Sequence, residues 1–143
     1  MTLEQLARIL SDGNHSLAVA SADGSVTTYD SRGVADLYRL ITCSPDKLDG
    51  AMVADKVVGK GAAALMAAGH IKALHTRVIR SPALKMLEDH DIKVKFDQLT
   101  DSIINRQGTG PCPVESLCKT TDDPRECIGL IHDFLIEKGI INQ

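Results

Sequence analysis

The stretch from Asn105 to Glu115 contains the residues of this chain whose types and spacing could most directly do chemistry. It reads Asn-Arg-Gln-Gly-Thr-Gly-Pro-Cys-Pro-Val-Glu. Glycine permits tight turns and proline fits the first turn of a helix, so the pattern predicts a loop that leads into a helix. Cys112 would then lie at the positive end of that helix, which favours the thiolate, and Glu115 would lie one turn further on. Cys112 and Glu115 are therefore the candidate catalytic residues.

The same loop also contains polar residues that could bind a ligand. Arginine forms bidentate contacts with phosphate, and the glycines expose backbone N–H groups. The candidate ligand-binding residues of this loop are Asn105, Arg106, Gly108, Thr109 and Gly110. The alternatives involve no ligand and no reaction. The polar residues could form hydrogen bonds that only stabilise the loop, and Cys112 could be packed rather than reactive. An activated nucleophile also needs an oriented base, so the residues leave open whether the chain is an enzyme.

A second candidate region follows the apolar run 51–54. We expect Asp55 and Lys56 at the carboxyl end of a strand, where α/β sheets bind ligands. Lys60 lies between two glycines at the predicted start of a helix, a position that can hold a phosphate or carboxylate. The segment lacks the first glycine and the hydroxyl residue that a P-loop requires. The alternatives are a solvated Lys60 and an Asp55 that forms a local ion pair or cap.

Hydrophobic periodicity predicts the elements that must position these residues. It indicates helices over residues 2–11, 33–41, 59–69, 82–89 and 124–138, and strands over 17–20, 26–29, 51–54, 71–79 and 92–96. The sequence Asp23-Gly24 between the first two strands predicts a hairpin. Later strands alternate with helices, which is typical of a mixed sheet covered by helices on both faces. We expect one α/β domain over residues 1–143.

Composition and charge exclude several classes of protein. The 143 residues are 43% apolar and 24% charged, as in ordinary globular proteins, and the net charge is −3. An acidic chain without tryptophan does not suggest a nucleic-acid partner, and no apolar run is long enough for a membrane span. The N-terminus does not resemble a signal peptide, so we expect a cytoplasmic protein with reduced cysteines. The cysteine spacing is not that of a structural zinc site, and we expect no metal and no cofactor.

Two longer blocks of sequence, residues 50–65 and 104–115, resemble the signature blocks of a small prokaryotic family. Its members are domains of unknown function with a cytidine deaminase-like fold. The resemblance covers the chain from about Leu17 to Glu115. It implies a three-layer α/β/α sandwich with a mixed sheet.

The resemblance also implies that the zinc chemistry of the deaminases is lost. Zinc deaminases combine a His/Cys-x-Glu motif with a Pro-Cys-x-x-Cys motif. By position, Val58 stands where a ligand belongs, Lys60 where the acid/base glutamate belongs, and Glu115 where the last cysteine belongs, so Cys112 alone keeps its ligand identity. The implied function is the binding of a small molecule of the nucleoside or nucleotide type. The alternatives are a Cys112-dependent transferase or hydrolase and a non-catalytic regulatory or structural homo-oligomer.

Overall fold

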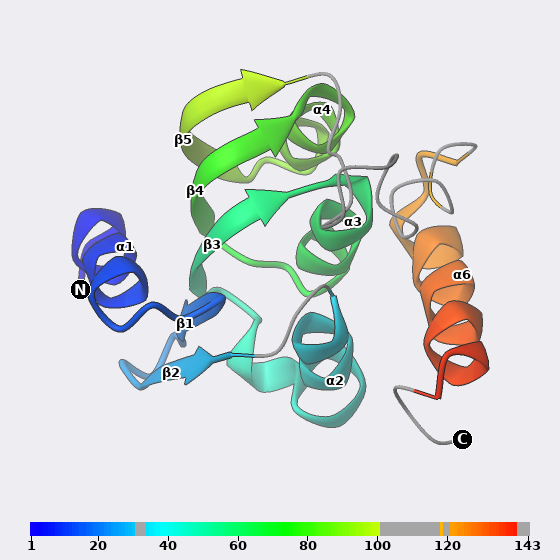
Figure 1. The fold of residues 1–143 in the computed structure, drawn as a ribbon, viewed down its shortest axis with the longest axis horizontal. Coiled ribbons are helices and arrows are strands. Elements are labelled where there is room, and N and C mark those ends of the chain that lie inside the picture. Colours follow the sequence, from blue (N-terminus) through cyan, green and yellow to red (C-terminus); the bar gives the residue numbers. More distant parts are fainter. Residues whose placement is uncertain (31–33, 101–117, 119–120, 140–143) are drawn as a thin grey trace.

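A five-stranded mixed sheet lies at the centre of the protein, with strand order β2-β1-β3-β4-β5 (Figure 1). The computed structural model describes residues 1–30, 34–100, 118 and 121–139. The strands are β1 Leu17–Ala20, β2 Val26–Tyr29, β3 Met52–Val58, β4 Ala73–Arg80 and β5 Lys93–Thr100. The helices are α1 Leu3–Asp12, α2 Ala35–Cys43, α3 Lys60–Ala68, α4 Ser81–Asp89 and α6 Pro124–Glu137, with a 3-10 turn at Pro45–Lys47. Helix α1 lies on one face of the sheet, and α2, α3 and α4 lie on the other.

The hairpin predicted around Asp23-Gly24 is confirmed. Strands β1 and β2 pair antiparallel from Leu17 with Tyr29 to Ala20 with Val26. Gly24 has a φ of 93°, which glycine adopts without strain, and the Asp23 carboxylate accepts a hydrogen bond from the Ser25 N–H at 2.9 Å. Local turn chemistry therefore determines this part of the fold.

The predicted ends of two strands are wrong. Strand β3 continues past residue 54 to Val58, and β5 continues past residue 96 to Thr100. Both extensions pair in parallel with β4, which supplies hydrogen-bond partners that the alternation of apolar residues along one strand does not reveal. Asp55 and Lys56 consequently lie inside β3 rather than after it.

The parallel strands β3, β4 and β5 bring their carboxyl ends to one edge of the sheet. Helix α3 begins two residues after β3, helix α4 follows β4 directly, and β5 ends at Thr100 in register with the last residue of β4. The chain after Thr100 lies outside the described residues as far as residue 117. Seven predicted site residues fall in that segment, namely Asn105, Arg106, Gly108, Thr109, Gly110, Cys112 and Glu115.

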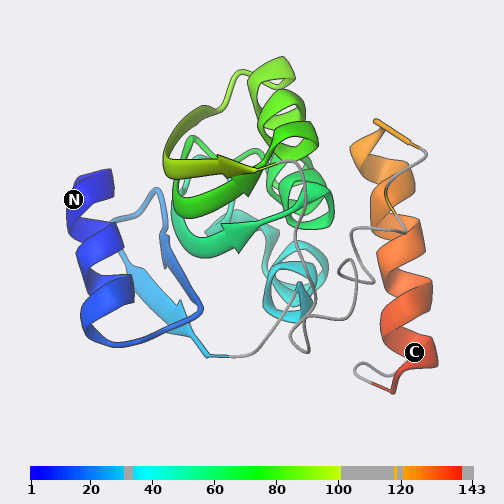
Figure 2. The same cartoon turned by 45° about the horizontal axis from the view of Figure 1, so that its top comes forward.

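Helix α3 lies at the centre of the larger hydrophobic core. Every residue from Lys60 to Ala67 is buried, because the sheet, α2, α4 and α6 all pack around this helix. A helix that is apolar on all sides is typical of such a position, and its alanines allow the neighbours to approach closely. Figure 2 shows α6 outside the layer of α2, α3 and α4. The predicted α/β sandwich is thus present in its broad form, with α6 as an additional layer.

The opposite face of the sheet has a smaller core beneath α1. Leu6 and Leu10 of α1 pack on Ala18, Ala20 and Ala54 of the sheet. Thr2 begins α1 with a capping box, in which its hydroxyl accepts from the Gln5 N–H. In the part of the chain that the structure describes, no helix combines the length and the apolar character needed to cross a bilayer.

Candidate functional site

Three neighbouring strands place a carboxyl, a hydroxyl and an aromatic ring side by side. Asp55 on β3 is the register partner of Thr76 on β4, and Thr76 is the register partner of Phe96 on β5. Leu17, opposite Asp55 on β1, belongs to the larger core, so these side chains lie on the face of α2, α3 and α4. Asp55 is half-buried, Thr76 is buried and Phe96 is 40% exposed. We call Asp55, Thr76 and Phe96 the Asp55 row.

Asp55 is the chemically distinctive member of this row. Burial raises the pKa of its carboxyl to about 7, while the backbone N–H groups of Lys56 and Val57, which donate to it, act in the opposite direction. The group therefore exists in both protonation states near neutral pH. A carboxyl of this kind can donate or accept a hydrogen bond, and it is suited to general acid–base work.

The strands are irregular at the level of the Asp55 row. Val53 and Val58 both contribute to the larger core although they are five residues apart, and so do Leu74 and Ile79 on β4. Strict alternation would place the members of each pair on opposite faces. The Asp55 carboxylate accepts from its own strand's N–H groups, and the Thr76 hydroxyl donates to the carbonyl two residues on at 3.0 Å. In both strands the side chains that face the larger core switch from one alternating set to the other at the same level. The parallel register of β3 and β4 therefore continues beyond the row.

Lys60 points toward α6. Its Nζ lies 2.8 Å from Oδ1 of Asp122, which precedes α6, and its side chain is 6% exposed while that of Asp122 is 90% exposed. The hydrogen bond from Lys60 and its charge lower the pKa of Asp122. Burial raises the pKa of the Cys127 thiol on α6, and the positive charge of Lys60 opposes this with a smaller effect. An anionic ligand at Lys60 would therefore compete with the Asp122 carboxylate.

Lys56 lies in a third environment. It neighbours Asp55 along β3, but its Nζ donates to Oδ1 of Asn14, after α1, at 2.9 Å. Successive side chains of a strand point to opposite faces, and this contact places Lys56 on the face of α1. The three predicted site residues that the structure describes are thus brought to different surroundings: Asp55 to the face of α2, α3 and α4, Lys56 to the face of α1, and Lys60 to the packing between α3 and α6.

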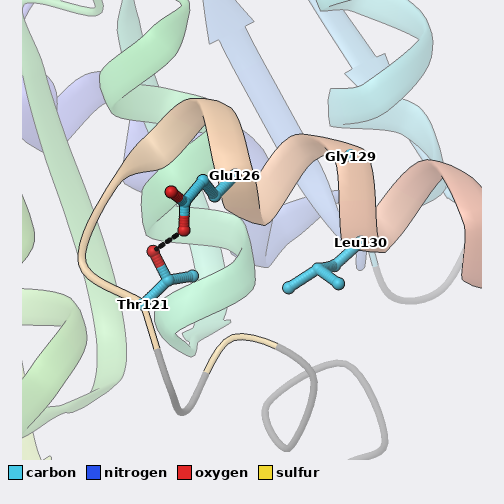
Figure 3. A pocket seen from close by; sticks show the side chains of 4 residues that line it. All are labelled: Thr121, Glu126, Gly129 and Leu130. Atoms are coloured by element: carbon cyan, nitrogen blue, oxygen red, sulfur yellow. Dashed lines mark hydrogen bonds between the residues drawn. The ribbon is translucent and has the colours of Figure 1, made fainter.

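A hollow in the described surface lies at the start of α6, and none of Asp55, Lys56 and Lys60 lines it. It has a volume of about 450 Å³ and is lined by Thr121, Glu126, Gly129 and Leu130 (Figure 3). The Thr121 hydroxyl donates to the Glu126 carboxylate at 2.7 Å, which stabilises the beginning of the helix. A smaller cavity of about 70 Å³ lies between α4 and Asp122. Neither contains a residue of the Asp55 row.

Sequence reasoning missed Thr76, Phe96 and Asp122. Phe96 had a signal, since it is one of only two phenylalanines and lies in a strand with charged neighbours. The proximity of Thr76 to Asp55 depends on strand register, and the contact of Asp122 with Lys60 joins residues 62 positions apart. Among the residues with described positions, no group of three or more His, Cys, Asp and Glu side chains could hold a metal ion.

Comparison with known proteins identifies the family. The chain is similar to a DUF1893 family protein from Thermotoga maritima, whose crystal structure was determined at 2.70 Å resolution. The two are 27% identical over 92% of this chain and 88% of the other, with a TM-score of 0.82. The search of curated proteins found no match. Residues 5–135 match the family described as a domain of unknown function, DUF1893, and the chain therefore belongs to that family.

Proposed function

We propose that this domain binds a small molecule of the nucleoside or nucleotide type, on a cytidine deaminase-like fold that has no deaminase zinc chemistry. The observation that supports the proposal is the Asp55 row. It combines a carboxyl that is half-ionised near neutral pH with an exposed aromatic ring two strands away. The row lies inside three parallel strands, three or four residues before their carboxyl ends, which is the edge where α/β sheets usually bind ligands.

Each member of the row has a separate part in this proposal. The Asp55 carboxylate accepts a hydrogen bond from a ribose hydroxyl, which is a common use of a carboxylate in dinucleotide-binding sheets. Phe96 stacks on the base, because aromatic rings attract the faces of all bases. Thr76 is buried and bonded to the carbonyl of Val78, so it orients the site rather than contacting the ligand.

The position of Val58 supports a proposal without deaminase zinc chemistry. That residue stands where the resemblance would place a zinc ligand, and its side chain is fully buried in the larger core. Lys60, which replaces the acid/base glutamate in the same comparison, forms an ion pair with Asp122. The alternative of a Cys112-dependent transferase or hydrolase rests on a residue outside the described part of the chain.

The test is a binding survey by protein NMR and calorimetry with the four common ribonucleosides and their 5′-monophosphates, each at up to millimolar concentration. We expect at least one to bind, and Phe96→Leu to weaken it by about 5- to 100-fold, since stacking on an aromatic ring is worth about 1–3 kcal/mol. Asp55→Asn should weaken binding by about tenfold, equivalent to about 1.4 kcal/mol, and should abolish the change in affinity between pH 6 and pH 8.

Lys56→Gln is the matched control. Lys56 neighbours Asp55 in the chain but bonds to Asn14 on the opposite face, so its substitution should leave ligand affinity unchanged. Ribose 5-phosphate tests whether the base is needed. The proposal fails if no nucleoside or nucleotide binds, or if Lys56→Gln weakens binding as much as Asp55→Asn does.

A further inference from the structure

The outer edge of β5 is the largest regular backbone surface left open in the described structure. Strand β5 is last in the sheet order, and none of the described strands pairs with its outer side. It is eight residues long, and all of these except Val94 and Thr100 are exposed. Phe96 is 40% exposed and Leu99 is 48% exposed. A strand of this length with apolar side chains on an open edge is a template for pairing with another strand.

Proteins usually protect such an edge with proline, a bulge, a very short strand or charged side chains, lysine especially. Strand β5 contains neither proline nor glycine. Its register with β4 runs from Lys93 to Phe96 and again from Gln98 to Thr100, and the pairing is interrupted at Asp97. Its charged residues are Lys93, Lys95 and Asp97. These charges have mixed sign, so they repel a second strand in some registers and attract it in others.

We propose that two copies of this chain pair antiparallel through their β5 strands, about a two-fold axis that passes beside Phe96. A two-fold interface uses the same surface on both copies. When the axis is perpendicular to the sheet, side chains that stand directly opposite each other across the two β5 strands must lie on the same face. The axis must then pass beside one residue of β5, which stands opposite the same residue of the second copy. This condition reduces the choice to a few registers, each named by its central residue.

The charges favour one of these registers. Centring on Gln98, Leu99 or Thr100 places none of the strand's charged residues opposite one another, so these registers gain nothing from charge. Centring on Lys95 or Asp97 places a charge opposite its own copy, and centring on Val94 places Lys93 opposite Lys95 twice. Centring on Phe96 instead places Lys95 opposite Asp97 twice, with the two rings facing each other between these pairs. Opposite charges and aromatic pairs across neighbouring strands are both favourable, and like charges are unfavourable.

Two features of the described structure are compatible with this pairing. Lys95 already forms an ion pair with Glu4 of α1, and an ammonium group has three donors, so it can bind a second carboxylate. Phe96 belongs to the Asp55 row, and the pairing therefore brings the ring of the second copy beside the proposed ligand site. The dimer would be a continuous sheet with the candidate sites on either side of its axis.

The test is the mass of the full chain in solution, measured by light scattering and by analytical ultracentrifugation over a range of concentrations. We expect a dimer for the unmodified chain. Lys95→Asp and Asp97→Lys each place two like-charged pairs across the axis and should raise the dissociation constant by at least about 100-fold. The double variant Lys95→Asp/Asp97→Lys restores opposite charges and should restore the dimer, which also shows that the single variants did not merely misfold.

Two control variants test whether the charge pairs across the axis, in this register, hold the dimer together. Glu4→Gln removes the ion-pair partner of Lys95 within one copy but leaves the β5 edge unchanged, so the dimer should persist. Lys93→Asp should also leave it intact, because Lys93 has no charged residue opposite it in the proposed register but stands opposite Asp97 in the register centred on Lys95.

Cross-linking gives a direct readout of the axis. In a Cys43→Ser background, Phe96→Cys should form a disulfide-linked dimer with glutathione disulfide as the oxidant, because opposite Cβ atoms lie about 4.5–5.5 Å apart. Leu99→Cys should not, since its own copy lies several residues away along the strand. Peptide mass spectrometry identifies the linked residues. A monomeric unmodified chain at high concentration, a double variant that stays monomeric, or equal cross-linking at residues 96 and 99 would each overturn the proposal.

Discussion

Helix α3 and strand β5 differ in how much of their surface the rest of the protein covers. Every residue of α3 from Lys60 to Ala67 is buried, whereas β5 is exposed along most of its length. After Lys60 the helix consists of glycine, alanine and other apolar residues, whereas the strand alternates charged and apolar residues from Lys93 to Asp97. The comparison separates a helix that is enclosed by the rest of the protein from a strand whose side chains are largely exposed.

The largest difference should appear when a leucine is truncated in each region. Leu65 of α3 is fully buried, and Leu65→Ala should lower the free energy of unfolding by about 2–5 kcal/mol through lost burial and a residual cavity. Leu99 of β5 is 48% exposed, and Leu99→Ala should cost less than about 1 kcal/mol. Urea unfolding of both variants at low protein concentration measures these two changes in the free energy of unfolding. Equal losses would contradict the contrast between the two regions.

Asp55, whose row ends on β5, should make stability depend on pH. The folded-state pKa of about 7 is above the ordinary value of 3.8, so the folded protein binds more protons between these values. The free energy of unfolding should therefore fall as pH rises from about 4 to about 7 and then level off. Asp55→Asn keeps an acceptor for the N–H groups of Lys56 and Val57 but cannot ionise. It should stabilise the protein at pH 8 by about 2–4 kcal/mol, since one pKa unit is about 1.4 kcal/mol.

The measurement is urea unfolding of both proteins across the pH range 4 to 8. Asp55→Ala serves as the comparison variant, because it also removes the charge but leaves the two N–H groups without their acceptor. It should therefore be less stable than Asp55→Asn at every pH. Unmodified protein that is equally stable at pH 5 and pH 8 would contradict the raised pKa.

The smallest expected effects concern two glycines, one at the end of α3 and one on the outer helix α6. A Cβ at Gly69 would lie 2.9 Å from Leu48 Cδ1 and 3.1 Å from Leu48 Cβ, so Gly69→Ala should destabilise the protein by about 1–3 kcal/mol. A Cβ at Gly129 would meet none of the described residues within 4 Å, so Gly129→Ala should stabilise α6 by about 0.5–1 kcal/mol. Thermal and urea unfolding of the pair should show opposite signs. The same sign for both would refute the tight packing around α3.

Several features follow from short stretches of the chain and were predictable from it. Asp23-Gly24 determines the first hairpin because a positive φ and a side-chain acceptor are local requirements. The apolar spacing of Leu6 and Leu10 and the capping residue Thr2 determine α1 in the same way. The apolar composition of residues 61–67 indicates a helix buried on all sides, and the structure shows one.

The candidate site depended on contacts between distant residues. Sequence could select Asp55 as a candidate ligand-binding residue, but its neighbours Thr76 and Phe96 follow from the register of three parallel strands. Lys60 and Lys56 were selected with Asp55, and the fold separates all three. Lys60 contacts Asp122, and Lys56 contacts Asn14 on the opposite face of the sheet.

The amino-acid sequence by itself therefore determined the type of most elements, the hairpin and the broad α/β class, and it singled out Asp55 as one candidate residue. Tertiary structure alone decided the length of β3 and β5, the packing of α6 on α3, the raised pKa of Asp55 and the place of β5 at the end of the described sheet. The physical reason is the range of the interactions involved. Capping, turn geometry and periodicity act within a few residues, whereas strand register, burial and ion pairing depend on which distant segments the fold brings into contact.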